Sequence, residues 1–201
     1  MNPIHRFEDQ IEALLQYPVR EGKLILYGSS FFHQWGYERA GAQWAEQGDL
    51  EVVNHGFGGA TVEELLYYYH RLVLPYKPSA MVFRTGHNDV WTNTAEESFY
   101  MTCRLLNWVK NDFPGIPLVL IKAFDHPSAL PENLHKLHKY NEMLDALAKE
   151  DPQIKTLDLN PFFYGSDGGF RDVFREDGLH LTDRGYAQMA SYLVPKVKAL
   201  L

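Results

Sequence analysis

The chain has 201 residues, of which 45% are hydrophobic and 14% aromatic, a composition typical of a globular protein with a substantial core. Its formal net charge is -7 with only 19 lysines and arginines, which argues against a nucleic-acid or anionic-membrane partner because either would need a basic face. We expect one domain over residues 1–201, because the chain shows no linker. We expect it to be cytoplasmic, because it shows no secretory signal and no membrane-length apolar run. Its lone Cys103 can form neither an intrachain disulfide nor a cysteine metal cluster.

Apolar runs that predict strands alternate along the chain with amphipathic patterns that predict helices. Helices are expected at 7–15, 31–46, 61–74, 95–112 and 134–147, and from 182 onward. Strands are expected at 24–28, 50–54, 80–85, 117–122 and 154–159. Because the strands are apolar on both faces, the alternation predicts an α/β fold: a three-layer α/β/α sandwich around a mainly parallel sheet of about five strands.

The first predicted strand ends at Gly28, and two hydroxyl residues, Ser29 and Ser30, follow it at the start of a predicted helix. Glycine permits a sharp turn, and the free N–H groups at a helix N-terminus can hold an anion. By itself a Gly-Ser-Ser sequence predicts no more than a helix cap, since serine is a preferred N-cap residue. The other motifs decide whether this corner carries a reactive group.

Three further motifs are expected near the same edge of the sheet, because ligands of parallel sheets bind beyond the C-terminal ends of the strands. Gly59 lies in a glycine-rich loop after the second strand, and Asn88 follows the third. Asp177 precedes His180 by one turn, so its carboxylate can bond the imidazole Nδ1 and leave Nε2 free as a base. With Ser30 as nucleophile, and the Gly59 N–H and Asn88 amide as oxyanion donors, the chain has the groups that acyl transfer needs.

The motifs at 28–30, 54–61, 86–89 and 177–180 resemble those of the SGNH hydrolases, also called GDSL esterases and lipases. The resemblance extends from about Lys23 to the final predicted helix. It implies a flavodoxin-like fold and a serine esterase that needs no cofactor.

The resemblance also implies a role for each matched residue. Ser30 would be the nucleophile, and Asp177 and His180 would complete the catalytic triad. The N–H groups of Ser30 and Gly59 would form the oxyanion hole together with the Asn88 amide.

One position departs from the family pattern. The usual Gly-Asp-Ser is Gly28-Ser29-Ser30 here, as in a bacterial branch with Gly-Ser-Ser, and what replaces the support of the aspartate is left open. If the loop were shifted by one residue, Ser29 would be the nucleophile instead.

Four residues are candidates for binding the substrate: Phe31, Phe57, His87 and Trp91. Aromatic rings near the sheet edge could stack on a sugar ring or hold a small acyl group. Packing roles suit Phe57 and His87 equally well.

Arg84 stands near the end of the third predicted strand, where an unpaired charge is costly. We expect a structural ion pair there, with the binding of an anionic substrate as the alternative. Lys122, at the end of the fourth strand, poses the same question.

The leading hypothesis is a metal-independent serine esterase acting on small or short-chain acyl esters, with acetylated carbohydrates among the candidates. A metal-dependent phosphoesterase is the second enzyme class, although the chain lacks paired metal-ligand motifs, and a non-catalytic binding module on the same fold is the third. We expect a small-molecule ester as the partner, with no cofactor, nucleic acid or membrane. A homo-oligomer is left open, since an exposed ring in Tyr67-Tyr68-Tyr69 would mark a subunit contact.

Overall fold

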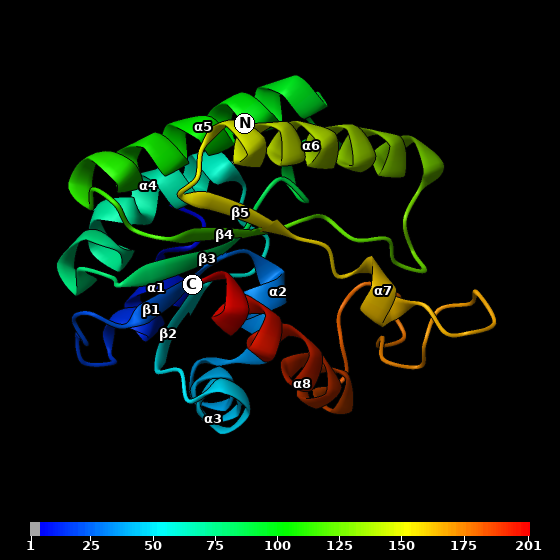
Figure 1. The fold of residues 1–201 in the computed structure, drawn as a ribbon, viewed down its shortest axis with the longest axis horizontal. Helices are drawn as coiled ribbons and strands as arrows, with labels where there is room; N and C mark the ends of the chain where they lie inside the picture. The colour runs from blue at the N-terminus through cyan, green and yellow to red at the C-terminus, as the bar shows by residue number, and fades with distance from the viewer. Residues whose placement is uncertain (1–4) are drawn as a thin grey trace.

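The computed structural model describes residues 5–201, whose strands form a parallel sheet in the order β2-β1-β3-β4-β5 (Figure 1). The strands are β1 (Leu24–Gly28), β2 (Val52–Gly56), β3 (Ala80–Arg84), β4 (Leu118–Ile121) and β5 (Ile154–Leu157). β1 pairs in parallel with β2 and β3, and β4 pairs in parallel with β3 and β5. The predicted α/β fold is therefore confirmed, and the strand order is that of flavodoxin-like sheets.

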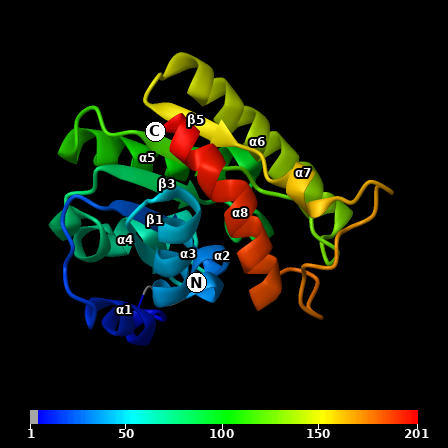
Figure 2. The same cartoon turned by 60° about the horizontal axis from the view of Figure 1, so that its bottom comes forward.

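Helices cover both faces of the sheet (Figure 1, Figure 2). Side chains alternate between the faces along each strand, so Ile25 and Tyr27 enter one apolar core while Leu24 and Leu26 enter the other. The first core is covered by α1 (Glu8–Leu15), α4 (Val62–Leu72), α5 (Ala95–Asp112) and α6 (Pro131–Glu150). The second core is covered by α2 (Ser30–Trp35), α3 (Tyr37–Gly48) and α8 (Asp183–Leu200). Short helices occupy three connections: η1 (Leu74–Tyr76), η2 (Asp89–Trp91) and α7 (Asn160–Phe163).

The helix predicted at 31–46 is in fact two helices, α2 and α3. Gly36 separates them with φ 78° and ψ 150°, outside the helical region, and its N–H closes α2 by donating to the carbonyl of His33. The predicted strand 50–54 is also displaced, because His55 and Gly56 pair with Tyr27 and Gly28 of β1. Pairing with a distant strand thus extends β2 into a segment that its glycine content assigned to a loop.

The short helix α2 packs directly against the end of β2. A Cβ atom added to Gly56 would lie 2.4 Å from the Cβ of Phe32 and 2.5 Å from the backbone nitrogen of His33. Real Cβ atoms do not approach other atoms so closely, so any larger residue at position 56 would push α2 away from the sheet. The absence of a side chain here therefore fixes where the first turn of α2 lies.

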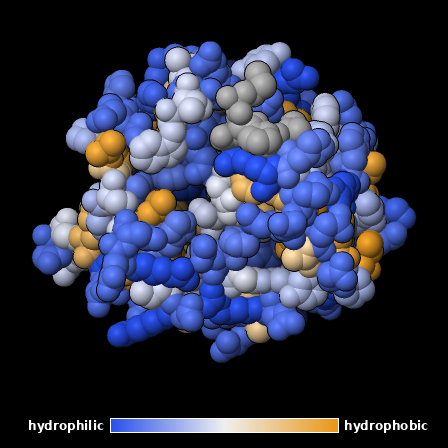
Figure 3. Space-filling model, turned by 180° about the vertical axis from the view of Figure 1, so that it is seen from behind, coloured by the Kyte–Doolittle hydropathy of each residue, from blue (hydrophilic) through white to orange (hydrophobic). Residues whose placement is uncertain are grey.

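The surface is mainly polar on the face drawn in Figure 3, where hydrophobic residues occur in small, separate groups. Among residues 5–201, the most exposed large hydrophobic residues are Tyr100, at 62%, Val19, at 54%, and Trp91, at 50%. Of the helices in residues 5–201, none has the combination of length and apolarity needed to cross a membrane.

Candidate active site

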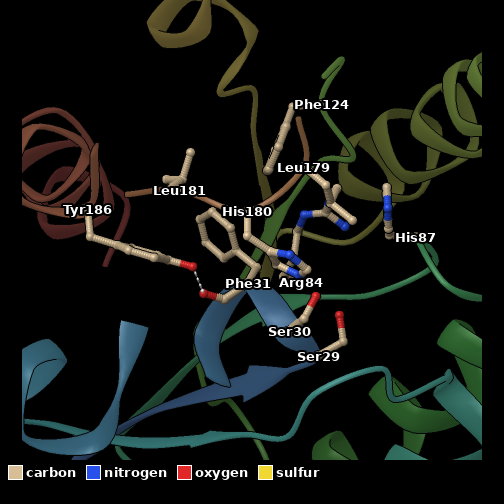
Figure 4. A pocket seen from close by; sticks show the side chains of 10 residues that line it. All are labelled: Ser29, Ser30, Phe31, Arg84, His87, Phe124, Leu179, His180, Leu181 and Tyr186. Atoms are coloured by element: carbon tan, nitrogen blue, oxygen red, sulfur yellow. Dashed lines mark hydrogen bonds between the residues drawn. The ribbon is translucent and has the colours of Figure 1, made fainter. Parts of the chain in front are cut away.

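Ser29 and Ser30 lie at the corner between β1 and α2, and both line a pocket at the C-terminal edge of the sheet (Figure 4). Ser29 is the N-cap of α2 and is only 5% exposed; its carbonyl accepts hydrogen bonds from the N–H groups of Phe32 and His33, both at 3.1 Å. Ser30, the first residue of the helix, is more exposed than Ser29. Of the two hydroxyls, that of Ser30 is thus the more accessible to a substrate.

Asp177 and His180 form the predicted pair. Asp177 Oδ2 lies 2.7 Å from Nδ1 of His180, and its other oxygen accepts the N–H groups of Leu179 and His180, both at 2.9 Å. Burial opposes ionisation of this carboxylate, but the hydrogen bonds from His180 and from the two backbone N–H groups outweigh it and lower the pKa of Asp177 to about 2. Asp177 is therefore ionised at neutral pH and orients the imidazole with Nδ1 as the donor.

The other imidazole nitrogen, Nε2 of His180, is buried and has no hydrogen-bond partner among the described residues. His180 lines the same pocket as Ser30, and their side chains approach it from opposite walls (Figure 4). No hydrogen bond between the Ser30 hydroxyl and Nε2 is present in residues 5–201. Such contacts are often long before a substrate binds, so the arrangement suits a nucleophile and base that come together on binding.

The two loops expected to supply oxyanion donors are joined to each other. The Asn88 side chain donates to the carbonyl of Ala60 over 2.8 Å, and Asp89 accepts the backbone N–H of Val62 over 2.9 Å. Gly59, directly before Ala60, has φ +84°, a conformation that glycine adopts readily. The Asn88 amide carries two N–H donors, and only one is needed for the bond to Ala60.

The pocket beside Ser30 contains about 300 Å³ of empty space, including space open to solvent. Of the four residues expected to bind substrate, Phe31 and His87 line this pocket. Phe57 does not: it is fully buried in the core, with its ring 5.3 Å from that of Phe7, so we assign it a packing role. Trp91, half exposed in η2, is likewise not among the lining residues.

Arg84 corrects a second expectation. It is 2% exposed and lines the pocket, but its Nε and Nη1 atoms lack hydrogen-bond partners in residues 5–201, so the expected structural ion pair is absent. Its guanidinium carbon lies 4.7 Å from the centre of the Phe124 ring. Lys122 does form an ion pair, with Asp145 at 2.8 Å.

Sequence reasoning missed several residues of this pocket. Phe124 follows β4, Leu179 separates the members of the Asp177–His180 pair, and Tyr186 reaches in from α8, where its hydroxyl donates to the carbonyl of Phe31 over 2.8 Å. A position within three residues of a strand end would have pointed to Phe124, and a position between two predicted site residues would have pointed to Leu179. Tyr186 offers none, because its helical pattern is that of a core residue.

The described residues, 5–201, contain no group of three or more histidine, cysteine, aspartate or glutamate side chains placed to hold a metal ion.

The fold is that of the SGNH hydrolases. A GDSL-like lipase from Bacteroides thetaiotaomicron has a similar structure with a TM-score of 0.73 at 19% identity, covering 98% of this chain and 97% of that one. Axe2, an acetylxylan esterase from Geobacillus stearothermophilus, gives a TM-score of 0.70 at 18% identity over 90% of this chain and 96% of its own.

Residues 26–188 match the GDSL-like lipase/acylhydrolase family, so the chain belongs to that family. The alpha2 subunit of platelet-activating factor acetylhydrolase IB is similar to it at 31% identity in Gallus gallus and 30% in Homo sapiens. Each match covers 76% of this chain and 66% of the relative's length, so this chain matches slightly less than two thirds of those proteins.

Proposed function

We propose that this protein is a serine esterase that cleaves short acyl esters through an acyl-enzyme on Ser30. The observation that carries the proposal is that an accessible serine and a histidine with a free Nε2 face one pocket, while an ionised aspartate bonds the opposite nitrogen of that histidine. This is the arrangement of nucleophile, base and orienting group by which triads are recognised.

In the proposed reaction, the Ser30 hydroxyl attacks the ester carbonyl while Nε2 of His180 takes its proton. The negative charge on the carbonyl oxygen is stabilised by the N–H groups of Ser30 and Gly59 and by the Asn88 amide. The tetrahedral intermediate then expels the alcohol, which receives the proton from His180. Water, deprotonated by the same nitrogen, then attacks the acyl-enzyme, and His180 returns the proton to the Ser30 oxygen as the acyl bond breaks and the acid is released.

Two comparisons support a short acyl group. One similar protein is named as an acetylhydrolase and another as an acetylxylan esterase, and both names describe the removal of acetyl groups. The pocket beside Ser30 has the aromatic walls of Phe31, Phe124 and Tyr186, which suit a small acyl group. No step of the proposed reaction requires a cofactor.

The proposal is tested by asking which of the two adjacent serines, Ser29 or Ser30, is the nucleophile. We expect Ser30→Ala to lower kcat on phenyl acetate by about 10⁴- to 10⁶-fold, because the nucleophile is lost, while Ser29→Ala retains most activity. Circular dichroism and thermal melting would establish that both variants fold. An alkyl phosphonate should label one peptide, identified by mass spectrometry as the one modified at Ser30.

Loss of activity in Ser29→Ala with retention in Ser30→Ala would shift the nucleophile by one residue. Full activity in both variants would overturn the serine esterase mechanism.

A further inference from the structure

Arg84 is not used by the proposed reaction, although its side chain lines the same pocket as Ser30. The residue is 2% exposed, its Nε and Nη1 atoms have no hydrogen-bond partner, and no carboxylate in residues 5–201 forms an ion pair with it. A buried charge without a partner is costly, because the protein interior replaces little of the lost hydration. The pocket therefore contains a cation for which the described chain supplies no anion.

The charge persists at neutral pH. Burial lowers the pKa of Arg84 to about 10, which still leaves the guanidinium protonated. The Phe124 ring, 4.7 Å from the guanidinium carbon, contributes a favourable cation–π contact but no countercharge. An anionic ligand would supply the negative charge that these contacts lack.

A second buried polar side chain faces the same space. His87 is 5% exposed, lines the pocket, and has both ring nitrogens buried without partners in the part of the chain that the structure describes. Burial, reinforced by Arg84, lowers the pKa of His87 well below its ordinary range, so the ring is neutral and offers one N–H donor. The other titratable groups that act on Arg84 or His87, namely His126, Tyr140, Tyr186 and His180, are not anions at neutral pH.

Sheet register brings these groups next to the nucleophile. Gly28 of β1 lies opposite Arg84 of β3, and Ser30 follows Gly28 by two residues. His87 lies just past the end of β3, on the same edge. Figure 4 shows the guanidinium between Phe124 and the corner that bears Ser30. A group held by Arg84 would therefore lie close to an ester bound at Ser30.

We propose that Arg84 and His87 form a carboxylate-binding subsite and that the enzyme acts on short esters carrying a carboxylate close to the ester bond. A guanidinium presents paired N–H donors that match the two oxygens of a carboxylate, and neutral His87 adds a further donor. The inference rests on the proposed function, since the subsite selects substrates only if Ser30 hydrolyses esters. The carboxylate belongs either to the acyl part, as in a monoester of a dicarboxylic acid, or to the alcohol part, as in an acylated hydroxy acid.

Two matched substrate pairs test the subsite and separate these sources. Monoethyl malonate and ethyl malonamate differ only by a carboxylate or amide on the acyl side, and O-acetylglycolate and O-acetylglycolamide differ in the same way on the alcohol side. We expect the wild-type enzyme to prefer the carboxylate member of one pair in kcat/KM. Arg84→Gln should reduce that preference by about 10- to 100-fold, the loss expected for charge-assisted hydrogen bonds. Arg84→Lys keeps the charge but not the paired donors, so its preference for the carboxylate substrate should lie between those of wild type and Arg84→Gln.

Arg104→Gln, an exposed position on α5, is the control for the change in net charge and should leave the preference as in wild type. Unchanged preferences in Arg84→Gln for both pairs would overturn the subsite. If Ser30→Ala still hydrolysed these esters, the proposed function itself would fail, so the two failures are distinguishable.

Binding measurements keep the test decisive if Arg84→Gln is inactive. Isothermal titration calorimetry should detect malonate binding to folded Ser30→Ala, and the added Arg84→Gln substitution should abolish it. No binding of malonate to Ser30→Ala would overturn the inference.

Discussion

Asp89, next to the proposed oxyanion residue Asn88, carries an unusual carboxyl group. One oxygen accepts the N–H of Val62, whereas Oδ2 is buried and has no hydrogen-bond partner among the described residues. Burial is the main cause that raises the pKa of Asp89 to about 6. The residue therefore holds the start of α4 in place at the cost of burying a group that ionises near neutral pH.

This shift predicts a pH-dependent stability. Because the folded-state pKa is raised above the ordinary value of 3.8, the folded protein binds more protons than the unfolded chain between pH 4 and 6. Stability should therefore fall as pH rises through this range, by about 3 kcal/mol from this group alone. Asp89→Asn keeps an acceptor for the Val62 N–H but cannot ionise, so urea unfolding should show its stability relative to wild type increasing from pH 4 to pH 7.

Asp172→Asn, which removes an exposed carboxylate, is the matched control and should show no such trend. A constant difference between wild type and Asp89→Asn across the pH range would contradict the prediction.

Among the helices and strands, the position of α2 depends on Gly56, because the glycine has no side chain and lets the helix lie close to β2. Gly56 of β2 lies under the first turn of the helix, where an added Cβ would meet the backbone of His33 at 2.5 Å. We expect Gly56→Ala to lower the free energy of unfolding by about 1–3 kcal/mol, since backbone rather than a flexible side chain must move. Because Ser30 begins α2, kcat on phenyl acetate should fall as well.

Gly41 provides the opposite case within α3, where an added Cβ would meet nothing within 4 Å. Gly41→Ala should raise the free energy of unfolding by about 0.5–1 kcal/mol, because alanine loses less conformational entropy in a helix. Chemical denaturation of both variants checks the pair. Equal effects at the two positions would show that the close approach of α2 to β2 does not constrain the fold.

In the whole molecule, the pocket lies where the strands end, between two short connections and the longer segment 164–182 that carries Asp177 and His180. Residues 85–94 connect β3 to α5 and include the short helix η2. Residues 122–130 connect β4 to α6. Loops of this length do not form the large lid or long acyl tunnel of an enzyme that acts on long-chain lipids. The polar face drawn in Figure 3 and the net charge of -7 do not favour docking on anionic lipid surfaces.

This architecture predicts a preference for short acyl chains. In a series of nitrophenyl esters, kcat/KM should peak at about two to four acyl carbons, because each further methylene gains up to about 0.8 kcal/mol only where a pocket receives it. A rate that kept rising with chain length, and increased sharply once the substrate formed micelles, would indicate an apolar channel instead.

Sequence patterns were enough to predict the order of the five strands and the longer helices, and the local contact between Asp177 and His180. Apolar runs identified β1, β3 and β4, because burial on both faces leaves a continuous apolar run, whereas β5, with Lys155 exposed, carries a weaker pattern. A carboxylate three residues before a histidine can reach it within one turn, whatever the rest of the chain does. The roles of Ser30, Gly59 and Asn88 were inferred from motif resemblance and remain predictions.

Which distant groups meet depends on how the strands and helices pack, and the sequence patterns did not predict it. The shared pocket of Ser30 and His180, the core position of Phe57 and the unpartnered charge of Arg84 all depend on sheet order and register. From its place in a strand, Arg84 was expected to form an ion pair, since an unpaired buried charge is costly. The partners and the solvation of a buried charge come from other segments of the chain, so the position of Arg84 in the sequence did not show that no carboxylate in residues 5–201 meets it. Local sequence specifies which side chains a strand carries to its end, whereas the packing of neighbouring strands and helices specifies what those side chains face.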